Sequence, residues 1–460
     1  MKHISRQLMF FVIFATAALL VFTGVSPYQL RSQLSFLPLV IKNPDPDSGP
    51  GATATPSATS ITNIVGNYNI PVGPGYTDVS PKQIVRTSTN RLYVAASTCD
   101  SYPCTDIAQK LHMYQASSIG IPIGFKHVAA NAEPGAIAGW AIAIDGNNRI
   151  HVAWTDRTSS GSMINRLRYT TFDTATNTWS GSIETIDGAL DVSLDGGGQG
   201  MQSVALALDA NAVPHIVYLR KSTSDTERHI YYRNRISGSW STATRLDDTI
   251  DYGANQKAWH PNLAFDTAGR ILAVWERGSF NRDNDGTIFG RVRETNGTWQ
   301  AAVNISGSNA ARVTIDQSTS LVITPDNHYH IAWISSPADY IRYQYSSNLG
   351  QSWSFNNPAG GTQATHNPSL GYTNGKLRIY GHGTPQPQPD DQGDDLFYFE
   401  TSGDSAAWGT WTKIVTGNYD SSVNTRWSQY FHAFPNTVDI AYWDENYPNQ
   451  LFVGSEILAP

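Results

Sequence analysis

One pattern recurs along most of this chain: an apolar run, a polar turn and a second apolar run that ends in an aromatic residue. Each copy predicts a β-hairpin, because short apolar runs are joined by turns rich in Asp, Asn and Gly. A repeat of this kind confines the chain to folds built from many copies of one β unit. The seven copies, of which the first is the weakest, occupy residues 83–96, 141–154, 204–218, 262–275, 321–333, 370–380 and 431–442.

A second series, a turn followed by Trp, stays in phase with the hairpins. Its members are Trp179, Trp240, Trp299, Trp353 and Trp411. A further aromatic strand lies between the two series, so each unit of 47–64 residues holds about four strands. Units of this size are typical of propeller blades. We therefore expect an all-β, seven-bladed β-propeller of four-stranded blades, with six or eight blades as alternatives. The last unit is one strand short, and residues 61–72 offer a strand that would close the ring and remove an open edge.

The N-terminal segment predicts the compartment. A basic start at residues 2–6 precedes an apolar run over residues 8–25, which is the pattern of a signal peptide or an uncleaved membrane anchor. Both alternatives place the propeller outside the cytoplasm, secreted or anchored on the outer side of the bacterial cell membrane. The predicted domains are residues 1–27 as signal or anchor, 28–60 as a Pro-, Ser- and Thr-rich linker, and 61–460 as the propeller.

The net charge excludes one class of partner, and the two cysteines predict one covalent bond. The formal net charge of −7 provides no basic surface for nucleic acid. The only two cysteines, Cys99 and Cys104, lie in one short segment and predict a local disulfide in an oxidising compartment. No cofactor is expected to be required. Asn281, Asp283 and Asp285 match the first half of a calcium loop, and a solvated acidic turn is the alternative.

The stretch SSNLGQSW at residues 346–353 fits an Asp box, S-x-D-x-G-x-x-W, with Asn348 in the Asp position. With its repeats, the chain from 61 to 457 resembles the bacterial BNR-repeat, sialidase-like β-propellers. That resemblance implies that the box is a structural turn on the outer part of a blade. The superfamily includes sialidases, other glycosidases, polysaccharide lyases and non-catalytic binders. No early F/Y-R-I-P segment is present, so the chain departs from true sialidases.

Chemistry in a propeller is expected at one mouth of the central channel, where inner strands start and second strands end. There, two carboxylates could flank a glycosidic bond for hydrolysis, or a His or Tyr could remove a proton beside a uronate carboxylate that an Arg neutralises. The alternatives are that strand ends are simply solvated and that the Trp residues pack between blades. The catalytic candidates are Asp156, Glu276, Asp444, His260, His366, Arg277 and Tyr430. The substrate-binding candidates are Trp140, Gln202, Arg220, Trp259, His382 and Trp427.

Three histidines belong to a different class. His151, His215 and His330 lie inside second strands, so we expect them to be packed and hydrogen-bonded. For the whole chain, the sequence favours a monomeric extracellular carbohydrate-active enzyme, a glycoside hydrolase or polysaccharide lyase acting on a glycan at the channel mouth. A non-catalytic cell-surface propeller that binds glycan or protein is the alternative, and a purely structural surface protein is a third.

Overall fold

The chain divides into two compact units, Met1–Ser57 and Ala58–Pro460. The computed structural model describes only parts of the second unit, and every regular element in those parts is a β-strand. In these parts no helix is long and apolar enough to cross a membrane. The described residues are 84–89, 91–98, 109–116, 125–130, 136–158, 163–193, 203–221, 227–250, 256–279, 286–307, 319–335, 340–358, 366–373, 375–383, 395–415, 428–434, 437–443 and 451–457.

The strands form successive antiparallel sheets, most of them four-stranded, whose members follow one another in sequence. The first sheet contains β1 (Ile84–Arg86), β2 (Leu92–Thr98), β3 (Lys110–Ala116) and β4 (Phe125–Ala130). The second contains β5 (Ala136–Ile144), β6 (Arg149–Arg157), β8 (Arg166–Asp173) and β10 (Glu184–Asp187), with β9 (Thr178–Trp179) beside β8. The third contains β12 (Val204–Leu208), β13 (Pro214–Arg220), β14 (His229–Ile236), β15 (Ser239–Trp240) and β16 (Thr244–Arg245). A separate short pair joins β7 (Met163–Ile164) to β11 (Val192–Ser193).

The C-terminal half repeats this arrangement. The next sheet contains β17 (Lys257–Phe265), β18 (Ile271–Gly278), β19 (Thr287–Arg293) and β20 (Val303–Asn304). It is followed by β21 (Ser320–Ile323), β22 (Tyr329–Ser335), β23 (Tyr340–Ser346) and β24 (Ser354–Phe355). Then come β25 (His366–Thr373), β26 (Lys376–Gly383), β27 (Asp395–Thr401) and β28 (Thr412–Val415), and finally β29 (Ser428–Phe434), β30 (Thr437–Trp443) and β31 (Leu451–Ile457). The predicted hairpins are confirmed as the first two strands of each sheet.

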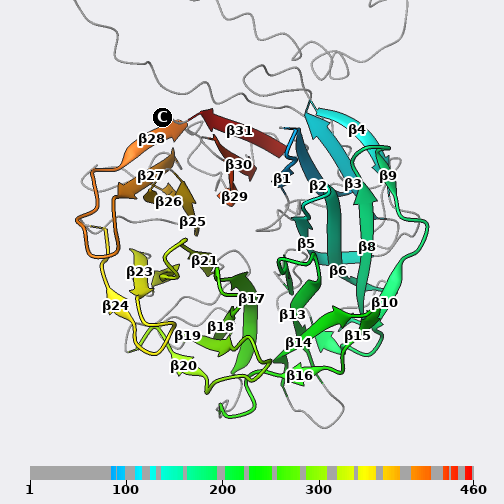
Figure 1. The fold of residues 1–460 in the computed structure, drawn as a ribbon, viewed down its shortest axis with the longest axis horizontal. Coiled ribbons are helices and arrows are strands. Elements are labelled where there is room, and N and C mark those ends of the chain that lie inside the picture. Colours follow the sequence, from blue (N-terminus) through cyan, green and yellow to red (C-terminus); the bar gives the residue numbers. More distant parts are fainter. Residues whose placement is uncertain are drawn as a thin grey trace, which may run out of the picture. The chain divides into compact units, whose positions relative to one another are not determined.

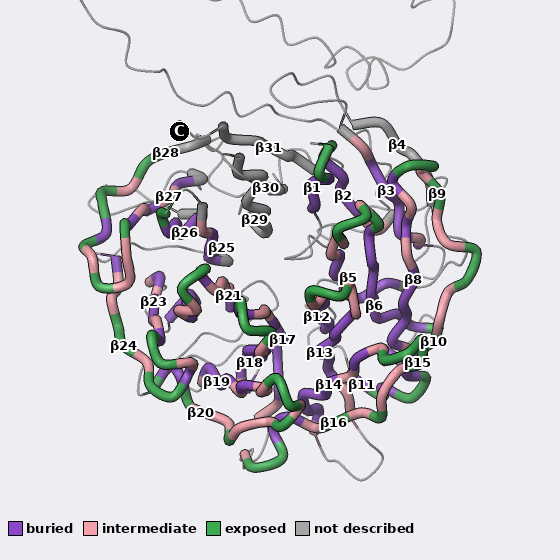
Figure 2. Tube along the Cα trace, viewed as in Figure 1, coloured by how far each residue is buried: buried purple, intermediate pink, exposed green. Residues whose placement is uncertain are grey.

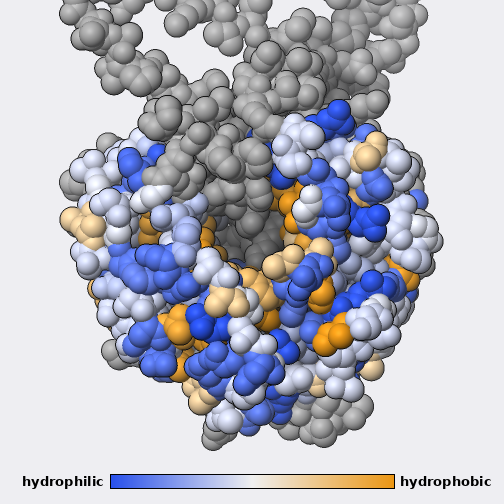
Figure 3. All heavy atoms as spheres, viewed as in Figure 1, coloured by the Kyte–Doolittle hydropathy of each residue, from blue (hydrophilic) through white to orange (hydrophobic). Residues whose placement is uncertain are grey.

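The sheets are arranged around a centre, as a propeller-like fold requires (Figure 1). The first strand of each sheet contacts the first strand of the next, in the order β1, β5, β12, β17, β21, β25 and β29, and β29 contacts β1 again. The second strands β6, β13, β18 and β22 are largely buried, whereas the short outer strands and their turns are more exposed (Figure 2). Polar side chains cover much of the outer part of the face seen in Figure 3. The predicted closing strand at 61–72 lies outside the described residues.

In three of the sheets, a buried His on the second strand is hydrogen-bonded to a Tyr on the third strand. The Nδ1 atom of each His lies 2.6–2.7 Å from the Tyr hydroxyl oxygen. The three His residues are at most 6% exposed, which confirms the expectation that they are packed and hydrogen-bonded. The pairs are His151 with Tyr169, His215 with Tyr232, and His330 with Tyr343.

Each of these Tyr rings also packs against a Trp ring of the following sheet. The ring centroids are 5.0–5.2 Å apart and the planes cross at 75–84°, the edge-to-face geometry that aromatic pairs favour. The partners of Tyr169 and Tyr232 are Trp240 and Trp299, which belong to the predicted Trp series. In the third case the partner of Tyr343 is Trp408 rather than the predicted Trp411. Two members of the series, Trp240 and Trp299, therefore form contacts between sheets.

The turn between β23 and β24 is held by its own side chains. The Ser346 hydroxyl accepts a hydrogen bond from the Gly350 amide at 2.9 Å, and Asn348 Oδ1 accepts one from the Ser352 amide at 3.0 Å. Trp353 Nε1 donates to the Gly350 carbonyl at 3.2 Å. Gly350 has a φ of +80°, which only glycine adopts at low cost. The turn lies at the outer end of its sheet (Figure 1).

We predict that Gly350→Ala destabilises the fold by about 2–3 kcal/mol, because an added methyl is strained both by the backbone and by its neighbour. Its Cβ would lie 3.0 Å from Val292 Cγ2 of the preceding sheet. Gly238 is a matched control: its φ is +83°, yet a Cβ there meets nothing within 4 Å, so Gly238→Ala should cost only about 1 kcal/mol. Urea unfolding of both variants measures the difference. Equal losses would show that the contact with Val292 is unimportant.

Burial of the His–Tyr pairs also makes the fold sensitive to acid. Burial lowers the pKa of His215 to about 4 and that of His330 to about 3, and it lowers the pKa of His151. Asp209 opposes the shift of His215, and Arg293 adds to it. These histidines are therefore neutral in the folded protein near neutral pH.

We predict that stability falls as the pH is lowered from about 6.5 to 4. The unfolded chain takes up protons on these histidines over that range, whereas the folded chain does not. His215 alone accounts for about 3 kcal/mol of the loss by pH 4. The free energy of unfolding measured against pH should have a shallower slope for His215→Gln than for the native chain. An unchanged slope would contradict the assignment.

Candidate functional site

Irregular pairing places one predicted residue, His260, in an unusual position. Along β17 the register with β18 shifts between Trp259 and Asn262, so the chain forms a bulge there. His260 lies inside the bulge with a φ of +44°, although it has a side chain and precedes Pro261. Such a backbone costs on the order of 1–2 kcal/mol, and strain of this kind gathers at functional sites. The bulge is therefore a reason to examine what His260 contacts.

The imidazole of His260 is paired with the carboxylate of Glu276 on β18. His260 Nδ1 lies 2.8 Å from Glu276 Oε2, and the two residues are 0% and 2% exposed. The other carboxylate oxygen, Oε1, accepts a hydrogen bond of 2.8 Å from the Thr319 hydroxyl. Thr319 directly precedes β21, so it belongs to the neighbouring sheet. Two residues that were predicted separately thus form one buried cluster, completed across a sheet interface.

The second ring nitrogen of His260, Nε2, is the atom of this cluster that could take part in a reaction. Among the residues that the structure describes, His260 Nε2 is buried and has no hydrogen-bond partner. When Nδ1 carries the proton and donates it to Glu276, Nε2 keeps a lone pair and can accept a proton or a hydrogen bond. Nε2 of His151 and His215 also has no hydrogen-bond partner in the described part of the chain, so the distinguishing feature of His260 is the carboxylate bound to its Nδ1. The arrangement is that of a general base held by a carboxylate.

A cation lies beside this cluster. Arg228 places its guanidinium 3.5 Å from the ring centroid of Trp259, the neighbour of His260, and its Nε donates to the Ala258 carbonyl at 2.8 Å. Trp259 is completely buried, and its Nε1 donates to the Gly278 carbonyl at 2.9 Å. Arg277 directly follows Glu276 and is partly buried. The surroundings therefore combine positive charge with an apolar wall.

Asp156, a second predicted carboxylate, has its own set of partners. Arg166 donates to both oxygens, at 2.6 and 2.9 Å, and Trp154 Nε1 donates to Oδ2 at 3.2 Å. Burial raises the pKa of Asp156, and the hydrogen bonds and charge of Arg166 act in the opposite direction. With its hydrogen-bonding capacity engaged in this way, Asp156 has the contacts of a structural ion pair.

Arg220 also takes part in a contact between sheets. Its Nη1 lies 3.3 Å from Asp187 Oδ2, and its guanidinium lies 5.3 Å from the ring centroid of Tyr231. The same Asp187 oxygen lies 3.3 Å from Arg233 Nη2 and accepts a hydrogen bond of 3.1 Å from the Tyr218 hydroxyl. Arg220 thus joins β13 to the end of β10.

The two described Trp candidates are interior residues. Trp140 is 1% exposed and donates to the Ala95 carbonyl at 3.2 Å, and Trp259 is 0% exposed. Both belong to hydrophobic clusters. Their burial favours the packing alternative over stacking on a sugar ring.

The side chains of the remaining predicted residues lie outside the described part of the structure. His366, His382 and Tyr430 lie in β25, β26 and β29, but only their backbone is described. In the described ranges, no group of three or more His, Cys, Asp or Glu residues could hold a metal ion. The residues outside the described ranges are Gln202, Trp427, Asp444, Asn281, Asp283, Asp285, Cys99 and Cys104.

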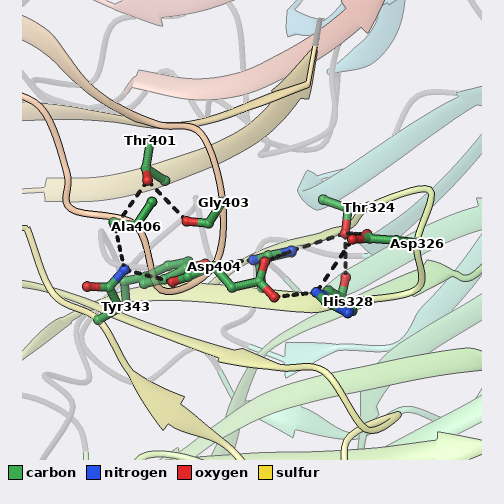
Figure 4. Close-up of polar contacts among 10 residues, drawn as sticks. Thr324, Asp326, His328, Tyr343, Thr401, Gly403, Asp404 and Ala406 are labelled. Atoms are coloured by element: carbon green, nitrogen blue, oxygen red, sulfur yellow. Dashed lines mark hydrogen bonds and ion pairs between the residues drawn. The ribbon is translucent and has the colours of Figure 1, made fainter.

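A second polar cluster, not foreseen from the sequence, joins the β21–β22 turn to the turn that follows β27 (Figure 4). His328 Nδ1 is paired with Asp404 Oδ2 and lies 3.6 Å from Asp326 Oδ2. Asn356 Nδ2 donates to the carbonyls of Asp404 and Ala406, at 2.7 and 2.9 Å. These backbone contacts fix one turn against the next sheet, which is a structural role.

Sequence reasoning also missed Thr319. A hydroxyl immediately before an inner strand was the available signal, because Ser203 holds the same place before β12. The Ser203 hydroxyl is hydrogen-bonded to the Thr155 hydroxyl of the preceding sheet. Thr155 and Glu276 each directly follow the closing aromatic of a second strand, so the two interfaces are equivalent.

No family model matches the chain, and no curated protein matches it. Among solved structures, a polysaccharide lyase is similar with a TM-score of 0.49 and 9% identity, covering 86% of this chain and 97% of that one. An ulvan lyase has a TM-score of 0.48 and 10% identity, covering 86% and 96%. The α-L-arabinanase of Penicillium chrysogenum, complexed with arabinobiose, has a TM-score of 0.46 and 11% identity, covering 87% and 99%. Likenesses this distant carry no functional conclusion.

We predict that Asp156→Asn lowers stability by about 2 kcal/mol, because it leaves Arg166 without its carboxylate. The loss is smaller than for a fully buried pair, since the Arg166 side chain is 23% exposed and can be hydrated. Thermal unfolding measures the change. If Asp156 is only structural, the variant stays active at a temperature where it is folded; loss of activity in a fully folded variant would place Asp156 in the site.

Proposed function

We propose that this protein is a carbohydrate-active enzyme in which His260 acts as the general base, and that the reaction is a lyase-type β-elimination on a uronate-containing glycan. The observation that carries the proposal is that His260 Nε2 has no hydrogen-bond partner among the described residues, while Nδ1 lies 2.8 Å from Glu276 Oε2. In this reaction the base removes the proton on the carbon next to the uronate carboxylate. The C–H electrons form a C=C bond, the bond from the β-carbon to the leaving oxygen breaks, and that oxygen takes a proton from water.

The contacts of the two described carboxylates, Glu276 and Asp156, favour a lyase over a hydrolase. Hydrolysis needs one carboxyl group to protonate the leaving oxygen and a second to attack or to activate water. Both oxygens of Glu276 are engaged by His260 and Thr319, and both oxygens of Asp156 are engaged by Arg166. A β-elimination needs instead a base and positive charge near the uronate carboxylate. We assign that charge to Arg228, whose guanidinium stacks on Trp259 beside His260. Arg277 directly follows Glu276 in β18, so its side chain points to the opposite face of the sheet.

The second candidate function is a non-catalytic propeller that binds a glycan or a protein. The complete burial of His260 favours it, because a base must reach its substrate. In this alternative the His260–Glu276 pair only fixes one sheet against the next.

The finer features of the chain are also proposals. We propose seven blades with a closing strand from 61–72, an Asp-box role for the turn at 346–353, and a disulfide between Cys99 and Cys104. We further propose that the protein acts as a monomer outside the cytoplasm, after cleavage or retention of its N-terminal segment. Calcium at residues 281–285 is a weaker proposal.

Turnover of candidate substrates by the full chain tests the function. Uronic-acid polysaccharides, sialosides and aryl-glycosides are supplied, and both unsaturated-uronate absorbance and new reducing ends are read. We expect absorbance from a uronate polymer only, and a decrease in kcat of about 10²–10⁴-fold in His260→Asn.

His151→Gln is the matched control, since it alters a buried structural histidine of another sheet and should leave kcat unchanged at a temperature where it is folded. Reducing ends without absorbance would identify a hydrolase. Glycan binding without any product would support the non-catalytic alternative and exclude the enzyme.

A further inference from the structure

The Glu276 carboxylate is shared between two sheets. Its Oε2 faces His260 Nδ1 within its own sheet, and its Oε1 accepts the Thr319 hydroxyl from the next sheet, each at 2.8 Å. Thr319 is 1% exposed, so water does not replace its hydroxyl readily. The orientation of His260 therefore depends on a residue that does not touch it.

The equivalent interface between β6 and β12 is formed by two hydroxyl groups. There the Thr155 hydroxyl meets the Ser203 hydroxyl, in positions equivalent to those of Glu276 and Thr319. A hydroxyl before an inner strand thus serves first as a contact between sheets. In the sheet of β17 and β18, the Glu276 carboxylate occupies the position of the Thr155 hydroxyl. It is also hydrogen-bonded to the His260 imidazole.

We infer that Thr319 is a positioning residue that keeps His260 in the tautomer with its proton on Nδ1. Its role in catalysis rests on the function proposed above, whereas its effect on the tautomer does not. Hydrogen bonds to a carboxylate favour the ionised form, and an ionised Glu276 can only accept the Nδ1 proton. Nε2 then keeps its lone pair.

Loss of the Thr319 hydroxyl shifts the equilibrium between the two tautomers of His260. Glu276 Oε1 would become a buried carboxylate oxygen without a donor, which favours uptake of a proton by the carboxyl group. A protonated Glu276 can donate to Nδ1, and the imidazole proton then moves to Nε2. In that tautomer His260 cannot act as a base through Nε2.

The bulge that presents His260 also holds Thr319. Asn262, two residues after His260, donates from Nδ2 to the Thr319 carbonyl at 3.2 Å, and its Oδ1 accepts the Leu263 amide at 2.9 Å. The bulge and the first residue before β21 are therefore one connected unit. The backbone of Thr319 stays in place when only its hydroxyl is removed, so the substitution tests the hydroxyl alone.

The test uses the full chain labelled with ¹⁵N in its imidazole rings, with the variants Thr319→Val, Thr319→Ser and Ser203→Ala. The ¹⁵N shifts of His260, assigned by comparison with His260→Asn, report which ring nitrogen carries the proton. We expect the Nδ1–H tautomer in the native chain, a shift toward Nε2–H in Thr319→Val, and recovery in Thr319→Ser.

Ser203→Ala is the matched control. It removes the equivalent hydroxyl from the other interface and should lower stability without moving the His260 signals. If Thr319→Val leaves these signals unchanged, or Ser203→Ala moves them as much, the inference is overturned.

Turnover adds a second readout where the native chain is active. We expect Thr319→Val to lower kcat about tenfold with KM unchanged, which is the effect of losing one hydrogen bond that matters in the transition state. Thr319→Ser should restore it. An unchanged kcat in Thr319→Val would overturn the catalytic role of Thr319. A native chain without activity, but with the tautomer response, would overturn the proposed function and leave the positioning role standing.

Discussion

The edge-on contact between a Trp of one sheet and a His-bonded Tyr of the sheet before it is the interaction on which the ring depends. Each sheet is small, and several of its outer strands have only two residues, so most of its stability must come from neighbouring sheets. A buried Tyr hydroxyl needs a partner, and a buried His provides it. The Trp then packs against a ring that is already fixed. Present at three interfaces between the described sheets, this contact joins sheets that share few backbone hydrogen bonds.

The sheet that carries the candidate base departs from this scheme. At the positions of the His and Tyr it has Leu272 and Gly290, and Ile305 fills the space of the missing ring. A Cβ on Gly290 would lie 2.6 Å from Ile305 Cδ1, so the replacement depends on glycine. This sheet has its imidazole at the bulge of β17 instead, paired with Glu276. This sheet therefore lacks the buried His on its second strand and has a buried His within its inner strand.

Much of the architecture could be predicted because its causes are local. Hairpin turns need Asp, Asn or Gly at fixed places, and short apolar runs mark the buried strands, so the repeated sheets can be recognised in the sequence. Contacts between sheets are harder to predict from the sequence. Trp408 rather than Trp411 packs against Tyr343, because the turn that follows β27 decides which indole reaches the interface. For the site, strand ends identified His260 and Glu276 separately. Their pairing depends on a bulge, and Thr319 comes from another sheet, so spacing along the chain could not reveal either.

The central claim is that His260 Nε2 is held free to accept a proton from a bound glycan. A crystal structure of the His260→Asn variant with a uronate oligosaccharide tests it most directly, because the substrate persists when the base is absent. The account predicts that the carbon next to the uronate carboxylate lies about 3–4 Å from the side-chain amide that replaces the imidazole, beside Glu276 and Thr319. A glycan bound at another part of the ring, with the substituted side chain still enclosed by protein, would contradict it.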